Sequence, residues 1–170
     1  MIKNALKVGL GVLCLVAISA KSSAEILTWS TIMYGFNEVP SNGSPGFGFV
    51  SGTLDSVSGL VVVTAGSFSG LVAPATGAHI HGLAGPGAVA GILIPLTVPA
   101  ATSGTISGSG TLSAANVAGM IAGMTYVNVH SSVYPGGEIR GQNTVVPEPV
   151  SLLTLVCGAG ALAFRRRNRV

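Results

Sequence analysis

Three histidines are the residues of this chain best suited to chemistry. His79 and His81 form a His-x-His pattern in a run that predicts a β-strand, so both imidazoles project from one face and could chelate one ion. His130 ends another predicted strand, and the sequence contains no further histidine. A Zn²⁺ or copper site would therefore need all three histidines, or a carboxylate from Glu38 or Glu138 in place of one.

A hydrogen-bonded network without metal is the alternative interpretation of the same residues. Histidines beside a carboxylate and an arginine can tie strand ends and loops together. Glu138 and Arg140 stand two positions apart and so share one face of a strand. Together with Glu38, they would be the charged members of this structural polar network. The residue pattern leaves the metal site and the network both open.

The sequence lacks the common catalytic motifs. It has no Gly-x-Ser-x-Gly nucleophile elbow and no phosphate-binding glycine loop followed by lysine. Its single aspartate, Asp55, falls in a turn-like stretch. We therefore expect a protein that is not an enzyme and that holds no cofactor, with copper or zinc on the histidines as the alternative.

The elements that must position these residues are mostly β-strands. Short runs rich in β-branched and aromatic residues recur between clusters of Gly, Pro, Asn and Ser, which is typical of a sandwich or barrel. The pattern predicts an all-β fold, an antiparallel, Greek-key-like and immunoglobulin-like β-sandwich. The expected strands are Leu27–Met33, Gly46–Leu54, Leu60–Ala65, Gly77–His81, Val89–Leu96, Gly104–Leu112, Tyr126–His130 and Glu138–Gln142.

One short helix is predicted among the strands, over Ser113–Met124. Ser113 can cap its first turn, and Gly123 is suited to end it. Apolar residues repeat at i, i+3, i+4 and i+7, which indicates one buried stripe rather than a functional surface. The stripe consists of Val117, Met120, Ile121 and Met124.

Charge is distributed unevenly along the 170 residues. The chain carries eight Lys plus Arg against five Asp plus Glu, a formal net charge of +3. Arg140 is nevertheless the only basic residue between Glu25 and Gln142, so this central part is acidic. An acidic domain without a basic patch excludes a nucleic-acid-binding role. Both cysteines, Cys14 and Cys157, also lie outside the central part, which can form no disulfide of its own.

Residues 1–24 resemble a secretory signal peptide. Lysines precede an apolar stretch, Val8–Ile18, and small residues follow it, which is the order of the three regions of such a peptide. We expect signal peptidase to cleave after Ala24, with cleavage after Ala20 as the alternative. An N-terminal membrane helix is the other interpretation of the apolar stretch.

The C-terminal end has the layout of a membrane anchor. An apolar block at 150–164 predicts a transmembrane helix, and the basic tail at 165–170 follows it. Positive charge beside a transmembrane helix stays cytoplasmic, so the preceding domain would lie across the membrane. A linker at 143–149 would join the domain to this helix. A plain C-terminal anchor is one interpretation of the segment.

A more specific interpretation of the C-terminal segment follows from Pro147, Glu148 and Pro149. Pro-Glu-Pro, an apolar helix and a terminal arginine cluster together resemble the PEP-CTERM sorting signal of Gram-negative bacteria. The resemblance implies transient membrane anchoring, recognition by an exosortase and removal of the tail near the motif. We therefore expect export across the inner membrane to the cell surface or extracellular matrix. Exopolysaccharide and surface proteins are the candidate partners there.

Four segments of the central domain, residues 25–142, form a recognisable set. They are Asn37–Pro40, Ala78–Gly82 with Ala84–Gly87, Tyr126–Ser131 and Tyr134–Gln142. Together they resemble the CHRD domain, which is named for chordin and also occurs alone in bacterial exported proteins. They appear in the order of the family, and Ser131, where the family commonly has Thr, keeps the hydroxyl. The resemblance implies an extracellular β-sandwich module.

A weaker resemblance connects the histidines with copper-zinc superoxide dismutase, another antiparallel sandwich. It implies that His79, His81 and His130 are copper ligands and that Arg140 guides an anion. The bridging histidine, the zinc-loop ligands and the disulfide of that enzyme have no counterpart here, and fold does not carry function. The first hypothesis is thus an exported, non-enzymatic CHRD-domain protein. The second is a Cu- or Zn-binding exported protein with a superoxide-dismutase-like sandwich.

Overall fold

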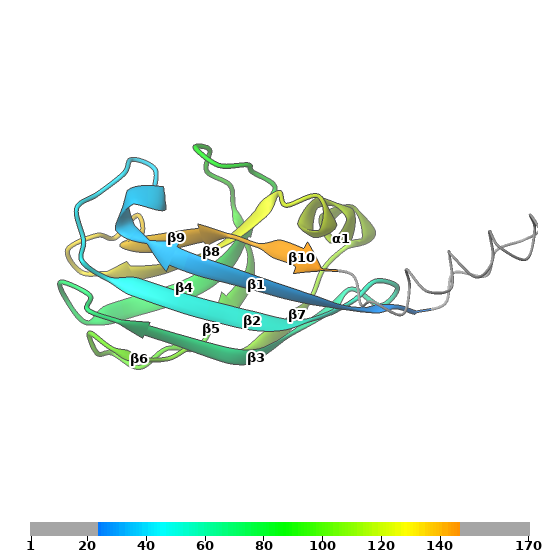
Figure 1. Cartoon of the computed structure of the whole chain (residues 1–170), viewed down its shortest axis with the longest axis horizontal. Coiled ribbons are helices and arrows are strands. Elements are labelled where there is room, and N and C mark those ends of the chain that lie inside the picture. The colour runs from blue at the N-terminus through cyan, green and yellow to red at the C-terminus, as the bar shows by residue number, and fades with distance from the viewer. Residues whose placement is uncertain (1–23, 147–170) are drawn as a thin grey trace, which may run out of the picture.

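The computed structural model describes residues 24–146, which form one antiparallel β-sheet with one short α-helix (Figure 1). The ten strands follow the order β5-β4-β8-β9-β1-β2-β3-β6, while β10 pairs with β1 and β7 pairs with β3. The strands are β1 Ile26–Tyr34, β2 Phe47–Asp55, β3 Leu60–Ser69, β4 Ala75–Gly82, β5 Ile92–Leu96, β6 Gly104–Thr105, β7 Ser109–Thr111, β8 Thr125–Ser131, β9 Ile139–Gln142 and β10 Thr144–Val146. The helix α1 spans Ala114–Ile121, and a 3₁₀ turn, η1, spans Gly35–Asn37.

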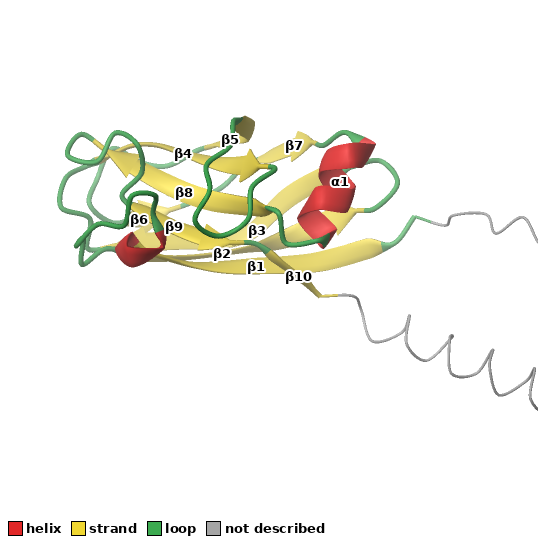
Figure 2. Ribbon diagram, turned by 90° about the horizontal axis from the view of Figure 1, so that it is seen from above, coloured by secondary structure: helices red, strands yellow, loops and turns green. Residues whose placement is uncertain are grey.

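The sheet curls into a half-barrel, so its two ends approach each other. Thr97, just after β5, exchanges two backbone hydrogen bonds with Ser107, between β6 and β7, at N···O distances of 2.8 and 3.1 Å. Figure 2 shows the half that contains β4 and β8 lying over the half that contains β1 and β2. Both halves thereby face a common interior.

The sandwich prediction differs from this architecture, because the two halves are hydrogen-bonded into one sheet. The strand that joins them is β1, which pairs with β2 along its whole length and meets β9 where Tyr34 lies opposite Arg140. Alternation of polar and apolar residues indicates which face of a strand is buried. A sandwich and a curled sheet bury the same face, so the pattern does not distinguish them.

One hydrophobic core fills the interior of the curl. Strand β1 shows how alternation builds it, because Leu27, Trp29 and Met33 point inward while Ile26 and Ile32 are exposed. Every larger strand contributes in the same way, and apolar burial of this kind is the main source of stability. The fully buried side chains include Met33, Val50, Leu54, Val61, Ile80, Met120, Val127, Val129 and Ile139.

The helix begins and ends for the predicted reasons. The hydroxyl of Ser113 accepts a hydrogen bond from the backbone N–H three residues on, at 3.3 Å. Gly123 adopts a φ of +73°, a left-handed conformation that glycine takes without strain. The helix is shorter than predicted, and only half of the apolar stripe is buried: Val117 and Met120 pack in the core, whereas Ile121, the last helical residue, and Met124, beyond the helix, are exposed.

The folded unit extends past the predicted domain end at Gln142. The Asn143 side chain is buried, and its amide donates a 2.9 Å hydrogen bond to the Thr125 hydroxyl. Strand β10 then pairs with β1, with Val146 opposite Thr28. The first four residues of the predicted linker are therefore part of the fold, because they complete a strand pair and satisfy a buried polar group.

The predicted terminal segments lie outside the described residues. They are the signal peptide up to Ser23, the Pro147–Glu148–Pro149 motif, the transmembrane helix at 150–164 and the basic tail at 165–170. Among residues 24–146, no helix has the length and apolar character needed to cross a membrane.

Candidate metal centre

The three histidines come together on one face of the sheet. His79 and His81 lie on β4 and His130 on β8, and these strands are antiparallel neighbours with His130 opposite Gly77. The ring centroids of His79 are 5.4 Å from those of His81 and 5.0 Å from those of His130. One ligand nitrogen from each ring lies within 4.8 Å of the other two. The strand pairing thus gathers the complete predicted ligand set.

Backbone carbonyls fix the proton positions of two of these rings. His81 Nδ1 lies 2.9 Å from the carbonyl oxygen of Ala90, and His130 Nδ1 lies 3.0 Å from that of Pro135. A carbonyl oxygen only accepts, so we assign the hydrogen to Nδ1 in both rings, which leaves the lone pair on Nε2. Metal-ligating histidines are commonly held in this way, which fixes both the tautomer and the ring orientation.

The surroundings favour the neutral form of all three imidazoles. The pKa values of His79, His81 and His130 are lowered from the ordinary value, chiefly because burial disfavours the charged ring. Neighbouring histidines lower the pKa of His79 and His130 further. The hydrogen bonds to the Ala90 and Pro135 carbonyls act in the opposite direction on His81 and His130. Neutral imidazole is the form that binds metal ions.

A stack on Tyr126 holds His81 in place, and Arg140 contacts the same tyrosine ring. The His81 ring stacks on Tyr126, with the ring centroids 4.9 Å apart and the planes at 4°. The Arg140 guanidinium carbon lies 3.5 Å from the centroid of the same tyrosine ring, a close cation–π contact. The Tyr126 hydroxyl accepts a hydrogen bond from the Ala90 backbone N–H at 3.1 Å. Because Ala90 also binds His81, both rings are anchored to one loop residue.

Alternation along the strands explains why these groups share a face. Tyr126, Asn128 and His130 alternate with core residues on β8, and across the β8–β9 pair Asn128 lies opposite Arg140. The loop 83–91 covers this polar face, and two of its carbonyls accept hydrogen bonds from side chains on β9. These bonds run from Arg140 Nη2 to Gly85 O at 3.3 Å and from Gln142 Nε2 to Ala84 O at 2.7 Å.

Several of these residues were not predicted from the sequence. Tyr126 and Asn128 precede His130 by four and two positions, so the period of two that relates His79 to His81 could have found them. Ala90 and Pro135 carry no comparable signal, because they act through backbone carbonyls that any residue would supply.

The predicted charged network divides into two parts. Glu38 is buried, and its pKa is raised by burial although the next backbone N–H and the charge of Arg140 lower it. Glu138 lies elsewhere: its Oε1 accepts 2.6 Å hydrogen bonds from the Ser44 hydroxyl and the Val72 backbone N–H. Glu38 and Arg140 therefore belong to the polar face beside the histidines, whereas Glu138 joins two loops.

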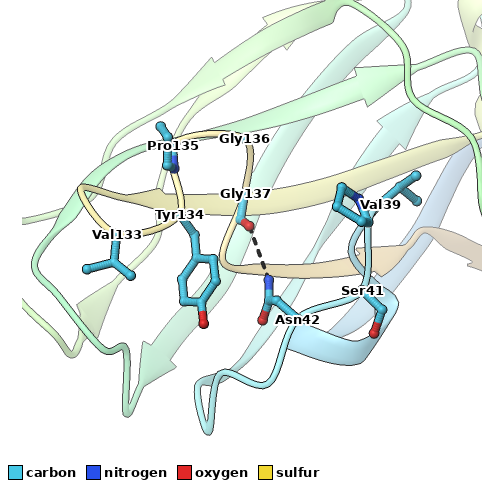
Figure 3. Close-up of a pocket in the computed structure, with 9 residues that line it drawn as sticks. Val39, Ser41, Asn42, Val133, Tyr134, Pro135, Gly136 and Gly137 are labelled. Carbon is cyan, nitrogen blue, oxygen red and sulfur yellow. Dashed lines mark hydrogen bonds between the residues drawn. The ribbon is translucent and has the colours of Figure 1, made fainter.

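A cleft of about 340 Å³ shares a loop with the histidine site (Figure 3). Its walls are the segments 39–42 and 133–137, which are linked by a 3.3 Å hydrogen bond from the Asn42 side-chain amide to the Gly137 carbonyl. Pro135 belongs to the cleft wall and also holds His130. A mostly apolar cleft with a few polar groups could admit a small ligand.

Fold and site define a small antiparallel β domain that carries a polar face with a three-histidine cluster. The family model of the CHRD domain matches residues 29–143, which is more than half of the chain. The chain therefore belongs to the CHRD domain family. The match ends at Asn143, the buried residue that lies past the domain end predicted from sequence. No curated protein matches the chain significantly.

Proposed function

We propose that this CHRD-domain protein is non-enzymatic and is exported across the inner membrane of a Gram-negative bacterium to the cell surface or extracellular matrix. The supporting observation is the arrangement of the sequence around the domain, because all basic residues except Arg140 lie in its two flanking ends. Signal peptidase and an exosortase would process these ends. Because Pro147 directly follows β10, the domain would lie close to the membrane until processing.

Deletion of residues 147–170 tests the sorting proposal. With its first 24 residues retained, the shortened protein should leave the membrane fraction and appear in the periplasm or the medium. A matched variant replaces only Pro147, Glu148 and Pro149 by alanine and keeps the apolar block. It should accumulate unprocessed at the membrane, since the anchor is present and the recognition motif is lost. Continued membrane retention of the deletion variant, or normal processing of the alanine variant, would contradict the proposal.

The second candidate function is the binding of Cu²⁺ or Zn²⁺ by His79, His81 and His130. It is favoured by one observation, the approach of one nitrogen from each ring to within 4.8 Å of the others. Nitrogen ligands on a tetrahedral ion are about 3.3 Å apart when each metal–nitrogen bond is about 2.0 Å. Small movements of the side chains would therefore complete the site. Three imidazoles suit copper or zinc, and a fourth position would stay open to solvent.

Metal content after dialysis tests this second function. The purified full chain is stripped with EDTA, dialysed against Cu²⁺ or Zn²⁺ and freed of excess ion. We expect about one equivalent of metal and a higher melting temperature that EDTA reverses. His79→Gln and His130→Gln should each lose the metal, whereas Asp55→Asn, in an exposed turn, should keep it. Absence of stoichiometric metal, together with melting that EDTA does not change, would overturn the metal function.

A further inference from the structure

Exposed aromatic side chains gather on the outer side of β1 and β2 and on the turn η1 that follows β1. Phe36, Phe47 and Phe49 are 66%, 46% and 38% exposed, and Tyr34 is 37% exposed. Between residues 24 and 146 the only other phenylalanine is Phe68, which lies in the core. Folded domains normally bury this residue type, and an exposed apolar cluster marks a binding surface. Three of the four described phenylalanines thus lie where packing does not require them.

Three of these rings are in contact with one another. Tyr34 stacks with Phe36 at 5.0 Å between centroids and 13° between planes, and with Phe47 at 6.4 Å and 30°. The β1–β2 register places Tyr34 opposite Phe47 and Ile32 opposite Phe49. We call these five residues the outer aromatic face. Tyr34 stacks on both Phe36 and Phe47 and is the least exposed of the four rings, so Phe36, Phe47 and Phe49 present most of the open ring surface.

Serine hydroxyls border the outer aromatic face on β3. Ser69 lies opposite Phe47 and Ser67 lies opposite Phe49, and both serines point outward, because Phe68 between them is buried. Hydroxyl groups beside flat apolar rings can bind a partner that is itself apolar on its faces and rich in hydroxyls at its edges. Sugar rings have this character, since pyranose C–H groups pack on aromatic faces while their hydroxyls need hydrogen-bond partners.

Charge complementarity restricts the partner further. The outer aromatic face and its serine border contain no charged residue. Arg140 is the only basic residue of the described chain, and although it lies opposite Tyr34 on the neighbouring strand β9, it is only 1% exposed. An anionic polymer or an acidic lipid surface would therefore meet no positive charge, and the acidic domain would repel it. A neutral partner fits this surface.

We propose that the outer aromatic face binds a neutral polysaccharide, with sugar rings packed against Phe36, Phe47 and Phe49. Both ends of the described chain lie toward the Ile26 end of β1, whereas the aromatic face lies toward the Tyr34 end (Figure 1). A tether at the C-terminus thus leaves the face free. The proposal goes beyond export and metal binding and depends on neither, because it concerns a different surface.

Retention on insoluble neutral polysaccharides tests the proposal. The purified full chain, in a polyoxyethylene detergent without a sugar headgroup, is mixed with particles of cellulose, chitin and a β-1,3-glucan. We expect retention on at least one of them and elution by its soluble oligosaccharide. Phe47→Thr and Phe49→Thr should each weaken retention about tenfold, the loss of one stacked ring. Threonine favours strands, so both variants should melt like the wild type.

Ile92→Thr is the matched control, because Ile92 is an apolar strand residue with 56% exposure on β5, away from the aromatic face. Its retention should equal that of the wild type. Failure of the wild type to bind any of the three polymers would overturn the proposal, as would equal retention of Phe47→Thr. Analytical ultracentrifugation could instead show a wild-type dimer that Phe47→Thr dissociates. If no polysaccharide then retained the protein, a second copy of the chain would be what covers the face.

Discussion

His79 Nδ1 lies 3.0 Å from His130 Nε2, although the two residues are 51 positions apart in the chain. Because His130 donates its Nδ1 hydrogen to Pro135, its Nε2 accepts, and His79 supplies the hydrogen between the two rings. A metal ion bound to both atoms would replace this hydrogen and shift His79 to its other tautomer. Metal binding would then compete with one hydrogen bond worth about 1 kcal/mol, a small cost beside several metal–ligand bonds.

The lowered histidine pKa values predict that the metal-free protein is destabilised in mild acid. His79, His81 and His130 have pKa values below the ordinary 6.5, so between these values and 6.5 the unfolded chain binds more protons than the folded one. Their contribution is fully present above 6.5 and is lost as the pH falls through the folded-state pKa values. Urea unfolding in EDTA, from about pH 8 to about pH 5, measures the loss.

Glu38 changes the free energy of unfolding with pH in the opposite direction, because its pKa is raised above 4.5 by burial. Its contribution is fully present below 4.5 and is lost as the pH rises through its folded-state pKa. A variant with all three histidines changed to glutamine should therefore lose the acid-induced decline and keep only the Glu38 effect. An unchanged decline in that variant would show that other groups cause it.

Strand positions followed from the sequence, whereas strand partners did not. The predicted ranges of β1, β2 and β8 agree with the structure to within one residue at each end. The predicted strand Gly104–Leu112 is instead divided into β6 and β7, because Ser107 pairs with Thr97 and Gly108 takes a φ of +150°. This division depends on a contact with a distant strand, which the local sequence pattern does not contain.

The same distinction holds for the histidine site. Spacing alone placed His79 and His81 on one face, since both belong to one strand. Adding His130 required the β4–β8 pairing, which the residue pattern did not specify. The sequence grouped Glu38, Glu138 and Arg140 as one network, but the loop that carries Ser44 binds Glu138 away from the histidines. Loop closure of this kind depends on three-dimensional packing rather than on periodicity.

Gly136 and Gly137 are neighbours that should respond differently to alanine. A Cβ at Gly137 would meet the Glu38 carboxylate and lie 2.9 Å from Asn128 Nδ2, and its φ is +138°. A Cβ at Gly136 would meet nothing within 4 Å. We expect Gly137→Ala to lower the free energy of unfolding by about 1–3 kcal/mol, and Gly136→Ala to change it by less than about 0.5 kcal/mol. Equal effects in urea titrations would argue against close packing around Glu38.

Tyr126 should contribute through its ring more than through its hydroxyl. Tyr126→Phe removes the hydrogen bond from the Ala90 backbone N–H but keeps the stack on His81. Its expected destabilisation is about 1 kcal/mol. Tyr126→Leu also removes the contact with buried Arg140 and should destabilise by about 2–4 kcal/mol. Thermal melting would rank the two variants. Equal stability of the Phe and Leu variants would show that the stack does not hold the site.

Variants at Glu138 distinguish a carboxylate that stabilises the fold from one that binds metal. It is fully buried, and its Oε1 holds the loops that carry Ser44 and Val72. Ser44→Ala removes one of these bonds and should destabilise by about 1 kcal/mol. Glu138→Leu removes the carboxylate that both loops share and should destabilise by about 3 kcal/mol or more, because the Ser44 hydroxyl and the Val72 N–H both lose their charged acceptor.

The same two variants should leave metal binding unchanged, because neither residue contacts a histidine in the described part of the chain. If Glu138→Leu were as stable as the wild type, the carboxylate would not be what connects the loops. If it folded but lost Cu²⁺ or Zn²⁺, Glu138 would have to be a ligand after all. That result would require the loop at Ser44 to release the carboxylate in the metal-bound protein.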